Sequence, residues 1–218
     1  MGPTLFVDSA DQQAAEELFA TGAFYGLTTN PTILERAGRT IADLRSIDRW
    51  ARAAGAREVC LQAWGETTAA LLASAADLLD IDASTVVKVP ATRTGIPAAA
   101  ALTEQGVSVL LTAVYRPTQM IAACAIGARY IAPYVGRMAD TGSDALADTV
   151  AMQRIADRAA NPTTVLAASL RSADDVARLA EAGVPAFTLS PAVAWEVLCD
   201  DRSETAATVF EETVAKLV

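Results

Sequence analysis

Eight short runs rich in β-branched and other apolar residues alternate with longer, alanine-rich runs along this chain of 218 residues. The alternation predicts eight strands, each followed by a helix, because β-branched residues favour strands and alanine favours helices. Strands that alternate with helices form a parallel sheet, and the count and length fit a closed (β/α)8 TIM barrel. The expected strands are 4–7, 24–27, 58–63, 85–89, 107–112, 130–133, 164–168 and 186–189.

The helical runs often stop at a glycine, which terminates helices because it readily adopts a left-handed backbone. An open, doubly wound sheet is the alternative fold, but the phosphate-loop spacing and the dinucleotide glycine fingerprint are both missing. We therefore expect one barrel domain over residues 1–218, α/β in class, with extra helices after the last strand. The expected helices are 10–20, 41–54, 67–79, 97–104, 118–126, 144–160, 173–182, 191–198 and 203–217.

The last expected helix, 203–217, is amphipathic. Its apolar residues are Ala206, Val209, Phe210, Val214 and Leu217. Such a stripe must cover another surface. We expect it either to close the bottom of its own barrel or to pack on a neighbouring subunit.

Composition excludes several classes of function. The hydrophobic share of 52% argues against disorder, and the formal net charge of −9, without a basic cluster, argues against a nucleic-acid partner. No apolar stretch approaches about 20 residues, and no leader precedes the first strand, so we expect no membrane partner. The three cysteines (Cys60, Cys124 and Cys199) fit neither a disulfide framework nor a zinc pattern, which favours a cytoplasmic location.

Histidine is absent from the chain. Its absence removes the commonest general base, the commonest metal ligand and the usual member of a serine-hydrolase triad. Proton transfer at any active site must then fall to Asp, Glu, Tyr, Lys or water.

Lys88 is the most informative single residue. The chain has 17 lysines and arginines, of which only Lys88 and Lys216 are lysines, and Lys88 lies inside the apolar run 85–90 (TVVKVP). Only an amine that can lose its proton forms a Schiff base with a carbonyl, whereas arginine stays protonated. Burial among valines disfavours the ammonium form and so favours a nucleophile. A snorkelling or ion-paired strand lysine is the structural alternative.

In a TIM barrel the chemistry takes place at the carboxyl ends of the strands. Polar side chains stand at or just after the ends of the expected strands: Asp8, Thr28, Asn30, Gln62, Lys88, Thr112, Tyr134, Arg137, Ser169 and Arg171. Each has a structural alternative. Asp8 would serve as the N-cap of the first helix, Asn30 and Pro31 as a turn, and the arginines as solvated surface charges.

If the register holds, the set suggests roles. Lys88 would attack a ketone, and the resulting iminium would act as an electron sink for cleavage of the adjacent carbon–carbon bond. Asp8 would move protons near Lys88, and Tyr134 with Gln62 and a held water would transfer protons at the aldol hydroxyl. Arg137, Arg171 and Ser169 would hold a phosphate, close to where barrels often bind one.

Most of these residues, all except Gln62 and Thr112, lie in segments that resemble the transaldolase family, and within it the branch of fructose-6-phosphate aldolases. The segments are 5–8 (LFVD), 26–32 (GLTTNPT), 86–90 (VVKVP), 127–137 (GARYIAPYVGR) and 166–171 (LAASLR). The resemblance covers almost the whole chain. It implies a (β/α)8 barrel with Lys88 as the Schiff-base lysine on the fourth strand, sugar or sugar-phosphate substrates, no metal and no organic cofactor. It also implies a homo-oligomer, a pentamer or a decamer, in which the C-terminal helix packs across subunits.

Four positions separate the two branches of the family. The resemblance places Gln62, Leu110, Ala132 and Tyr134 with the aldolases, since transaldolases usually carry Glu, Asn, Ser and Phe there. Arg171 departs from the aldolase pattern, which has lysine there, and matches the transaldolases instead.

We therefore expect a class I aldolase that reversibly joins dihydroxyacetone, or a related hydroxyketone, to an aldehyde such as glyceraldehyde 3-phosphate. A transaldolase that moves a dihydroxyacetone unit between sugar phosphates is the second hypothesis. A barrel that binds sugar phosphates without catalysis is the third.

Overall fold

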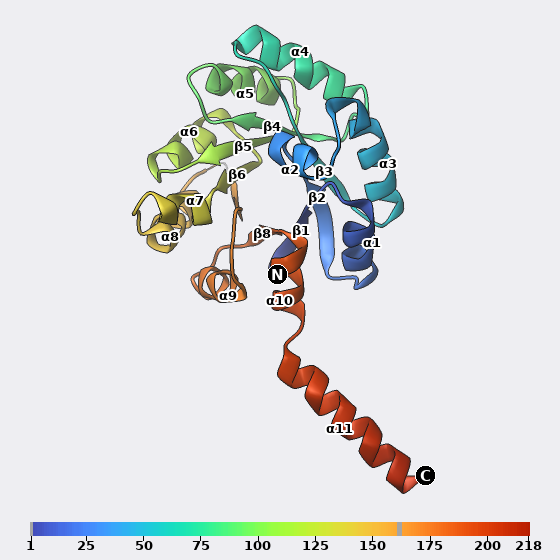
Figure 1. Ribbon diagram of the computed structural model, residues 1–218. Coiled ribbons are helices and arrows are strands. Elements are labelled where there is room, and N and C mark those ends of the chain that lie inside the picture. Colours follow the sequence, from blue (N-terminus) through green and yellow to red (C-terminus); the bar gives the residue numbers. More distant parts are fainter. Residues whose placement is uncertain (1, 161–162) are drawn as a thin grey trace.

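The computed structural model describes residues 2–160 and 163–218. Their eight strands form one closed parallel barrel in chain order (Figure 1), because β1 pairs with both β2 and β8. The predicted TIM barrel is confirmed, and the open doubly wound sheet is excluded. The strands are β1 (Thr4–Asp8), β2 (Phe24–Thr28), β3 (Glu58–Gln62), β4 (Val86–Pro90), β5 (Val109–Val114), β6 (Tyr130–Pro133), β7 (Thr164–Ala167) and β8 (Ala186–Leu189).

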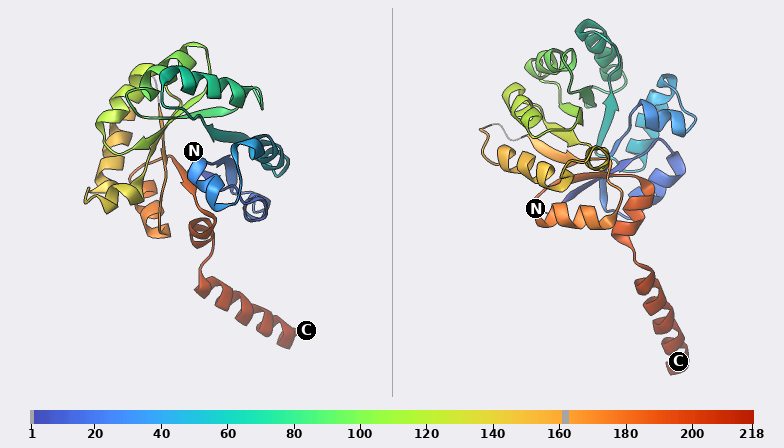
Figure 2. Two further views of the ribbon diagram at one scale, coloured as in Figure 1. Left: turned by 45° about the horizontal axis from the view of Figure 1, so that its top comes forward. Right: turned by 60° about the vertical axis from the view of Figure 1, so that its left-hand side comes forward.

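Helices surround the barrel (Figure 2) and follow the expected ones closely, with three differences. The expected helix 41–54 is divided into a 3-10 turn, η1 (Ile41–Asp43), and α3 (Leu44–Ala53), and the expected helix 144–160 ends four residues early. Two short helices, α2 (Pro31–Arg36) and α7 (Val135–Asp140), were not expected. The others are α1 (Gln12–Ala20), α4 (Thr68–Leu79), α5 (Gly95–Glu104), α6 (Thr118–Ile126), α8 (Ala145–Ala156), α9 (Ala173–Glu181), α10 (Pro191–Leu198) and α11 (Asp201–Leu217).

The core has two layers. The larger layer lies between the outer faces of the strands and the helices, and a smaller one fills the barrel interior around Phe6, Leu110 and Leu166. This is the packing expected when side chains alternate between the two faces of each strand.

A polar cluster closes the amino-terminal end of the barrel. Glu58 accepts hydrogen bonds from the hydroxyls of Tyr25 (3.1 Å) and Tyr130 (2.9 Å) and pairs with Arg129. Burial is the main cause that raises the pKa of both tyrosines, and the neighbouring Glu58 carboxylate adds to it. These side chains fill the amino-terminal end of the barrel, and their polar groups bond to one another. The cavity described below lies at the opposite, carboxyl-terminal end.

The C-terminal helix α11 projects away from the barrel (Figure 1), and none of its residues is buried. Phe210 is 66% exposed and Leu217 is 80% exposed. The expectation that this helix closes the bottom of its own barrel is therefore wrong. Among the helices that the structure describes, none combines the length and the apolar character that a membrane span requires.

Candidate active site

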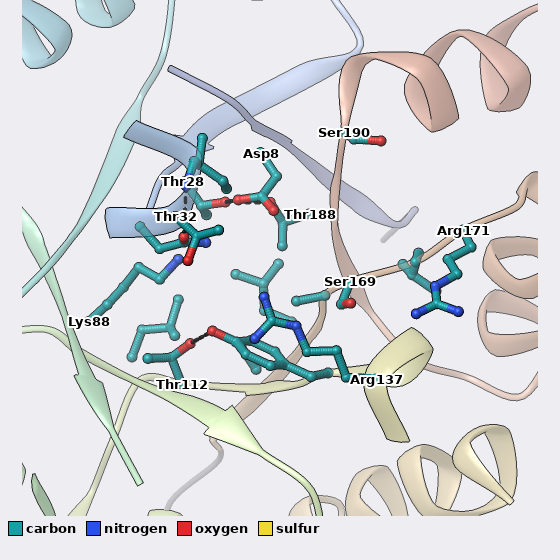
Figure 3. A pocket seen from close by; sticks show the side chains of 18 of the residues that line it. Asp8, Thr28, Thr32, Lys88, Thr112, Arg137, Ser169, Arg171, Thr188 and Ser190 are labelled. Carbon is teal, nitrogen blue, oxygen red and sulfur yellow. Dashed lines mark hydrogen bonds between the residues drawn. The ribbon is translucent and has the colours of Figure 1, made fainter. Parts of the chain in front are cut away.

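A cavity of about 240 Å³ opens at the carboxyl-terminal end of the barrel (Figure 3). The structure brings nine of the ten predicted site residues to its walls. They are Asp8, Thr28, Asn30, Lys88, Thr112, Tyr134, Arg137, Ser169 and Arg171. The tenth, Gln62, ends β3 and is the register partner of Lys88 on β4, but it does not line the cavity. Its role as a water-holding amide stays a prediction.

Lys88 lies in the middle of β4 and is only 4% exposed. Its Nζ donates a hydrogen bond to the backbone oxygen of Thr29 at 2.8 Å, and the side chain extends into the cavity (Figure 3). No ion pair involves Lys88 among residues 2–160 and 163–218, which argues against the ion-paired alternative. The amine is thus held by one neutral acceptor at the floor of a polar cavity.

Asp8 ends β1 and faces the same cavity. Its Oδ1 accepts a 2.6 Å hydrogen bond from the Thr28 hydroxyl. Burial raises the pKa of the Asp8 carboxyl, against the opposing effects of Lys88, the Thr28 bond and Arg137. The alternative role of Asp8 as a helix cap is wrong, because Asp11 caps α1 by accepting from the Ala14 N–H at 3.2 Å.

Tyr134 follows β6 directly, and its hydroxyl lies 2.8 Å from the hydroxyl of Thr112 on β5. Tyr115 contacts the ring edge-on, with the ring centroids 5.9 Å apart. Arg137 lies three residues further on, in α7, and its guanidinium carbon is 4.7 Å from the centre of the Tyr134 ring. Tyr134 is the residue before α7 and Arg137 lies in its first turn, so the phenol and this guanidinium line the cavity side by side.

The outer wall contains Arg137, Ser169 and Arg171, the three residues predicted to hold a phosphate, and that role stays a prediction. Arg171 is held by Asp140 through both carboxylate oxygens, and its hydrogen bonds lower the pKa of the Asp140 carboxyl. Gly136 lets α7 approach the segment after β7 closely, because a Cβ at position 136 would lie only 2.4 Å from the Ser169 carbonyl oxygen.

Asn30 begins α2 rather than forming a turn. Its side chain accepts from the Ile33 N–H at 3.1 Å, and Pro31 occupies the first helical position. Because α2 covers one side of the mouth, Arg36 at its last position lines the cavity as well. Arg36 was not among the predicted site residues, because α2 was not predicted.

Thr188 on β8 also lines the cavity and was missed. It was detectable, because alternation along β8 sends Ala186 and Thr188 inward and Phe187 and Leu189 outward. Its register partner on β1 is Phe6, two residues before Asp8.

The fold and the site together define a TIM-barrel protein with one buried lysine at the centre of a polar cavity at the carboxyl ends of its strands. The family model described as Transaldolase/Fructose-6-phosphate aldolase matches residues 5–217, and the chain belongs to this family. The predicted family is thus confirmed. It is a family of enzymes that act on sugar phosphates.

Similar proteins named "Probable transaldolase" occur in several bacteria. The protein from Caulobacter vibrioides (strain NA1000 / CB15N) is 33% identical over 87% of this chain and 86% of its own length. The one from Cereibacter sphaeroides (strain ATCC 17025 / ATH 2.4.3) is 35% identical over 86% and 84% of the two chains. The one from Pelotomaculum thermopropionicum (strain DSM 13744 / JCM 10971 / SI) is 30% identical over 98% of both.

Among solved structures, a mandelate oxidase with 3,3-difluoro-2-hydroxy-3-phenylpropionic acid superposes with a TM-score of 0.61 at 16% identity. The match covers 88% of this chain and 65% of the mandelate oxidase chain. At this identity the likeness shows the barrel fold and nothing about chemistry.

Proposed function

We propose that the protein is a class I aldolase of the fructose-6-phosphate aldolase type. It would reversibly join dihydroxyacetone, or a related hydroxyketone, to an aldehyde such as glyceraldehyde 3-phosphate. The observation that carries the proposal is the buried Lys88 amine in the same cavity as a carboxyl, Asp8, and a phenol, Tyr134.

The proposed reaction starts when the neutral Lys88 amine attacks the ketone carbon to give a carbinolamine. Loss of water then forms an iminium, with protons exchanged through Asp8, whose raised pKa suits it to proton transfer. The iminium accepts the electron pair of the adjacent carbon–carbon bond as that bond breaks. The aldehyde is released, and a three-carbon enamine stays on Lys88.

The fate of the enamine separates an aldolase from a transaldolase. In the proposal, Tyr134, oriented by its contact with Thr112, acts with Gln62 and a held water. As the phenol accepts the proton of the sugar hydroxyl during cleavage, its own proton passes to the held water, from which a proton then reaches the enamine carbon. Hydrolysis of the iminium then frees the ketone. Leu110 and Ala132 also line the cavity, as expected for the aldolase branch.

A transaldolase is the second candidate, favoured by the names of the similar proteins and by Arg171. Retro-aldol assays with fructose 6-phosphate separate the two. The proposal expects glyceraldehyde 3-phosphate to be released without an added acceptor. Rapid turnover only in the presence of erythrose 4-phosphate would contradict it.

We further propose that the active form is a homo-oligomer, a pentamer or a decamer, of single-domain subunits located in the cytoplasm. The exposed apolar stripe of α11, with Val209, Phe210, Val214 and Leu217, supports a second copy of the chain as the surface on which this helix packs. A lone subunit would leave that stripe in water.

A further inference from the structure

Thr188 lines the cavity, but neither the proposed mechanism nor the family segments give it a role. It is 3% exposed, and its Oγ1 lies 2.5 Å from the Oγ1 of Thr28. Thr28 in turn donates to Oδ1 of Asp8 at 2.6 Å. Residues from β8, β2 and β1 therefore form one continuous chain of hydrogen bonds that ends on the carboxyl group (Figure 3).

The chemistry of the hydroxyl group fixes the direction of this chain. A hydroxyl has one proton to donate. Thr28 uses its proton on Asp8, so it can only accept from Thr188, and the Thr188 hydroxyl must donate. Thr28 is 0% exposed, so water has no access to replace that donor if it is removed.

We infer that Thr188 is a positioning residue for Asp8. By donating to Thr28, it holds the Thr28 hydroxyl on Oδ1 and leaves Oδ2 as the oxygen that exchanges protons with intermediates on Lys88. The inference rests on the proposed function, because it assigns Thr188 a part in the Schiff-base chemistry of the same cavity.

The charged surroundings of Asp8 give the inference a pH signature. Lys88 on β4 and Arg137 on α7 lower its pKa electrostatically, and its direct hydrogen bond is the one from Thr28. Cys60 on β3 is a neutral thiol here, because burial raises its pKa to about 12. The bond from Thr28 lowers the pKa of the Asp8 carboxyl against the effect of burial. Weakening the bond therefore raises this pKa. If the reaction needs ionised Asp8, the pH below which its rate falls, the acid limb of the pH–rate profile, then moves to higher pH.

The test compares three variants by the rate at which borohydride traps an adduct with dihydroxyacetone, between about pH 5 and pH 9. Thr188→Val removes the hydroxyl at nearly constant volume, and Thr188→Ser keeps it. Thr85→Val is the matched control, because Thr85 is buried and its hydroxyl has no partner among the described residues. If valine prevents folding, Thr188→Ala replaces it with the same expectation.

We expect Thr188→Val to slow trapping about three- to tenfold at neutral pH, the usual effect of one lost hydrogen bond, and to shift the acid limb upward. Thr188→Ser should restore both, and Thr85→Val should match the unsubstituted protein. An unchanged rate and limb in Thr188→Val would overturn the inference alone. So would an equal loss at every pH that serine does not restore. Failure of the unsubstituted protein to form any adduct would instead overturn the proposed function, and the inference with it.

Discussion

In the proposed mechanism, the hydroxyl of Tyr134 separates free aldol cleavage from transfer. Tyr134→Phe removes the partner of Thr112 and, in the proposal, the group that moves the proton of the aldol hydroxyl. We expect cleavage of fructose 6-phosphate without acceptor to fall about 100-fold, within the range of general acid–base catalysis, and transfer to fall less. Both rates are measured by release or capture of glyceraldehyde 3-phosphate. Tyr115→Phe, a neighbouring exposed tyrosine, is the control. Equal losses in the two reactions would remove Tyr134 from this role.

Arg137 gives a second prediction at the scale of single residues. Its guanidinium stands over Tyr134 and is expected to bind the phosphate of the substrate through charge-assisted hydrogen bonds. Arg137→Ala should raise KM for glyceraldehyde 3-phosphate about tenfold or more and leave KM for unphosphorylated glyceraldehyde nearly unchanged. Arg116→Ala, an exposed arginine after β5, serves as the control. The same rise with both aldehydes would exclude phosphate recognition by Arg137.

At the scale of elements, the backbone is least relaxed beside the cavity. Ala113 in β5 and Ser169 after β7 have left-handed φ values of 56° and 59°. Residues other than glycine adopt a positive φ only at a cost in free energy, and residues with such strained backbones cluster at functional sites. The register of β5 with β6 also shifts between Leu111 and Val114, around this alanine.

Ala113→Gly should therefore raise the free energy of unfolding by up to about 1 kcal/mol, because glycine adopts a positive φ without a steric penalty. Ala125→Gly in α6, where the backbone is helical, should lower it by about 0.5–1 kcal/mol. Urea denaturation of the two variants checks the opposite signs. A loss of stability in Ala113→Gly as large as in the control would show that position 113 is not strained.

The eight strands were predictable to within two residues at each end because each is a compact apolar run between polar or glycine-rich turns. The helices α2 and α7 were missed for a physical reason. Each has only six residues, and its N-cap, Asn30 or Tyr134, is a residue that was predicted to belong to the site. The segments after these strands were therefore interpreted as site loops rather than as helices. The N-cap Asn30 and Pro31 at the first helical position were nevertheless visible signals.

Most of the site was predictable for the same reason that the barrel was. Once the strand ends are known, the barrel fold places Asp8, Lys88, Thr112 and Tyr134 around the same cavity at the carboxyl ends of the strands. Contacts between residues distant in sequence, such as Thr28 with Thr188, depend on barrel closure and register. Neither can be obtained from one strand alone.

At the scale of the whole molecule, α11 is the feature that a lone subunit does not explain. Phe210→Glu places a charge in its apolar stripe, whereas Thr208→Glu adds the same charge about 200° away around the helix. We expect Phe210→Glu to reduce the molar mass measured by light scattering after gel filtration, and Thr208→Glu to leave it unchanged. A protein that is monomeric without any substitution would contradict the proposed assembly.

The central claim is that Lys88 forms a covalent Schiff base. The most direct test is to reduce the protein with borohydride in the presence of dihydroxyacetone and to map the modified peptide by mass spectrometry. We expect one reduced three-carbon adduct on Lys88. We expect no adduct on Lys216, the only other lysine, and none in a folded Lys88→Arg variant. An unmodified Lys88 with every hydroxyketone tried would contradict Schiff-base formation at this residue.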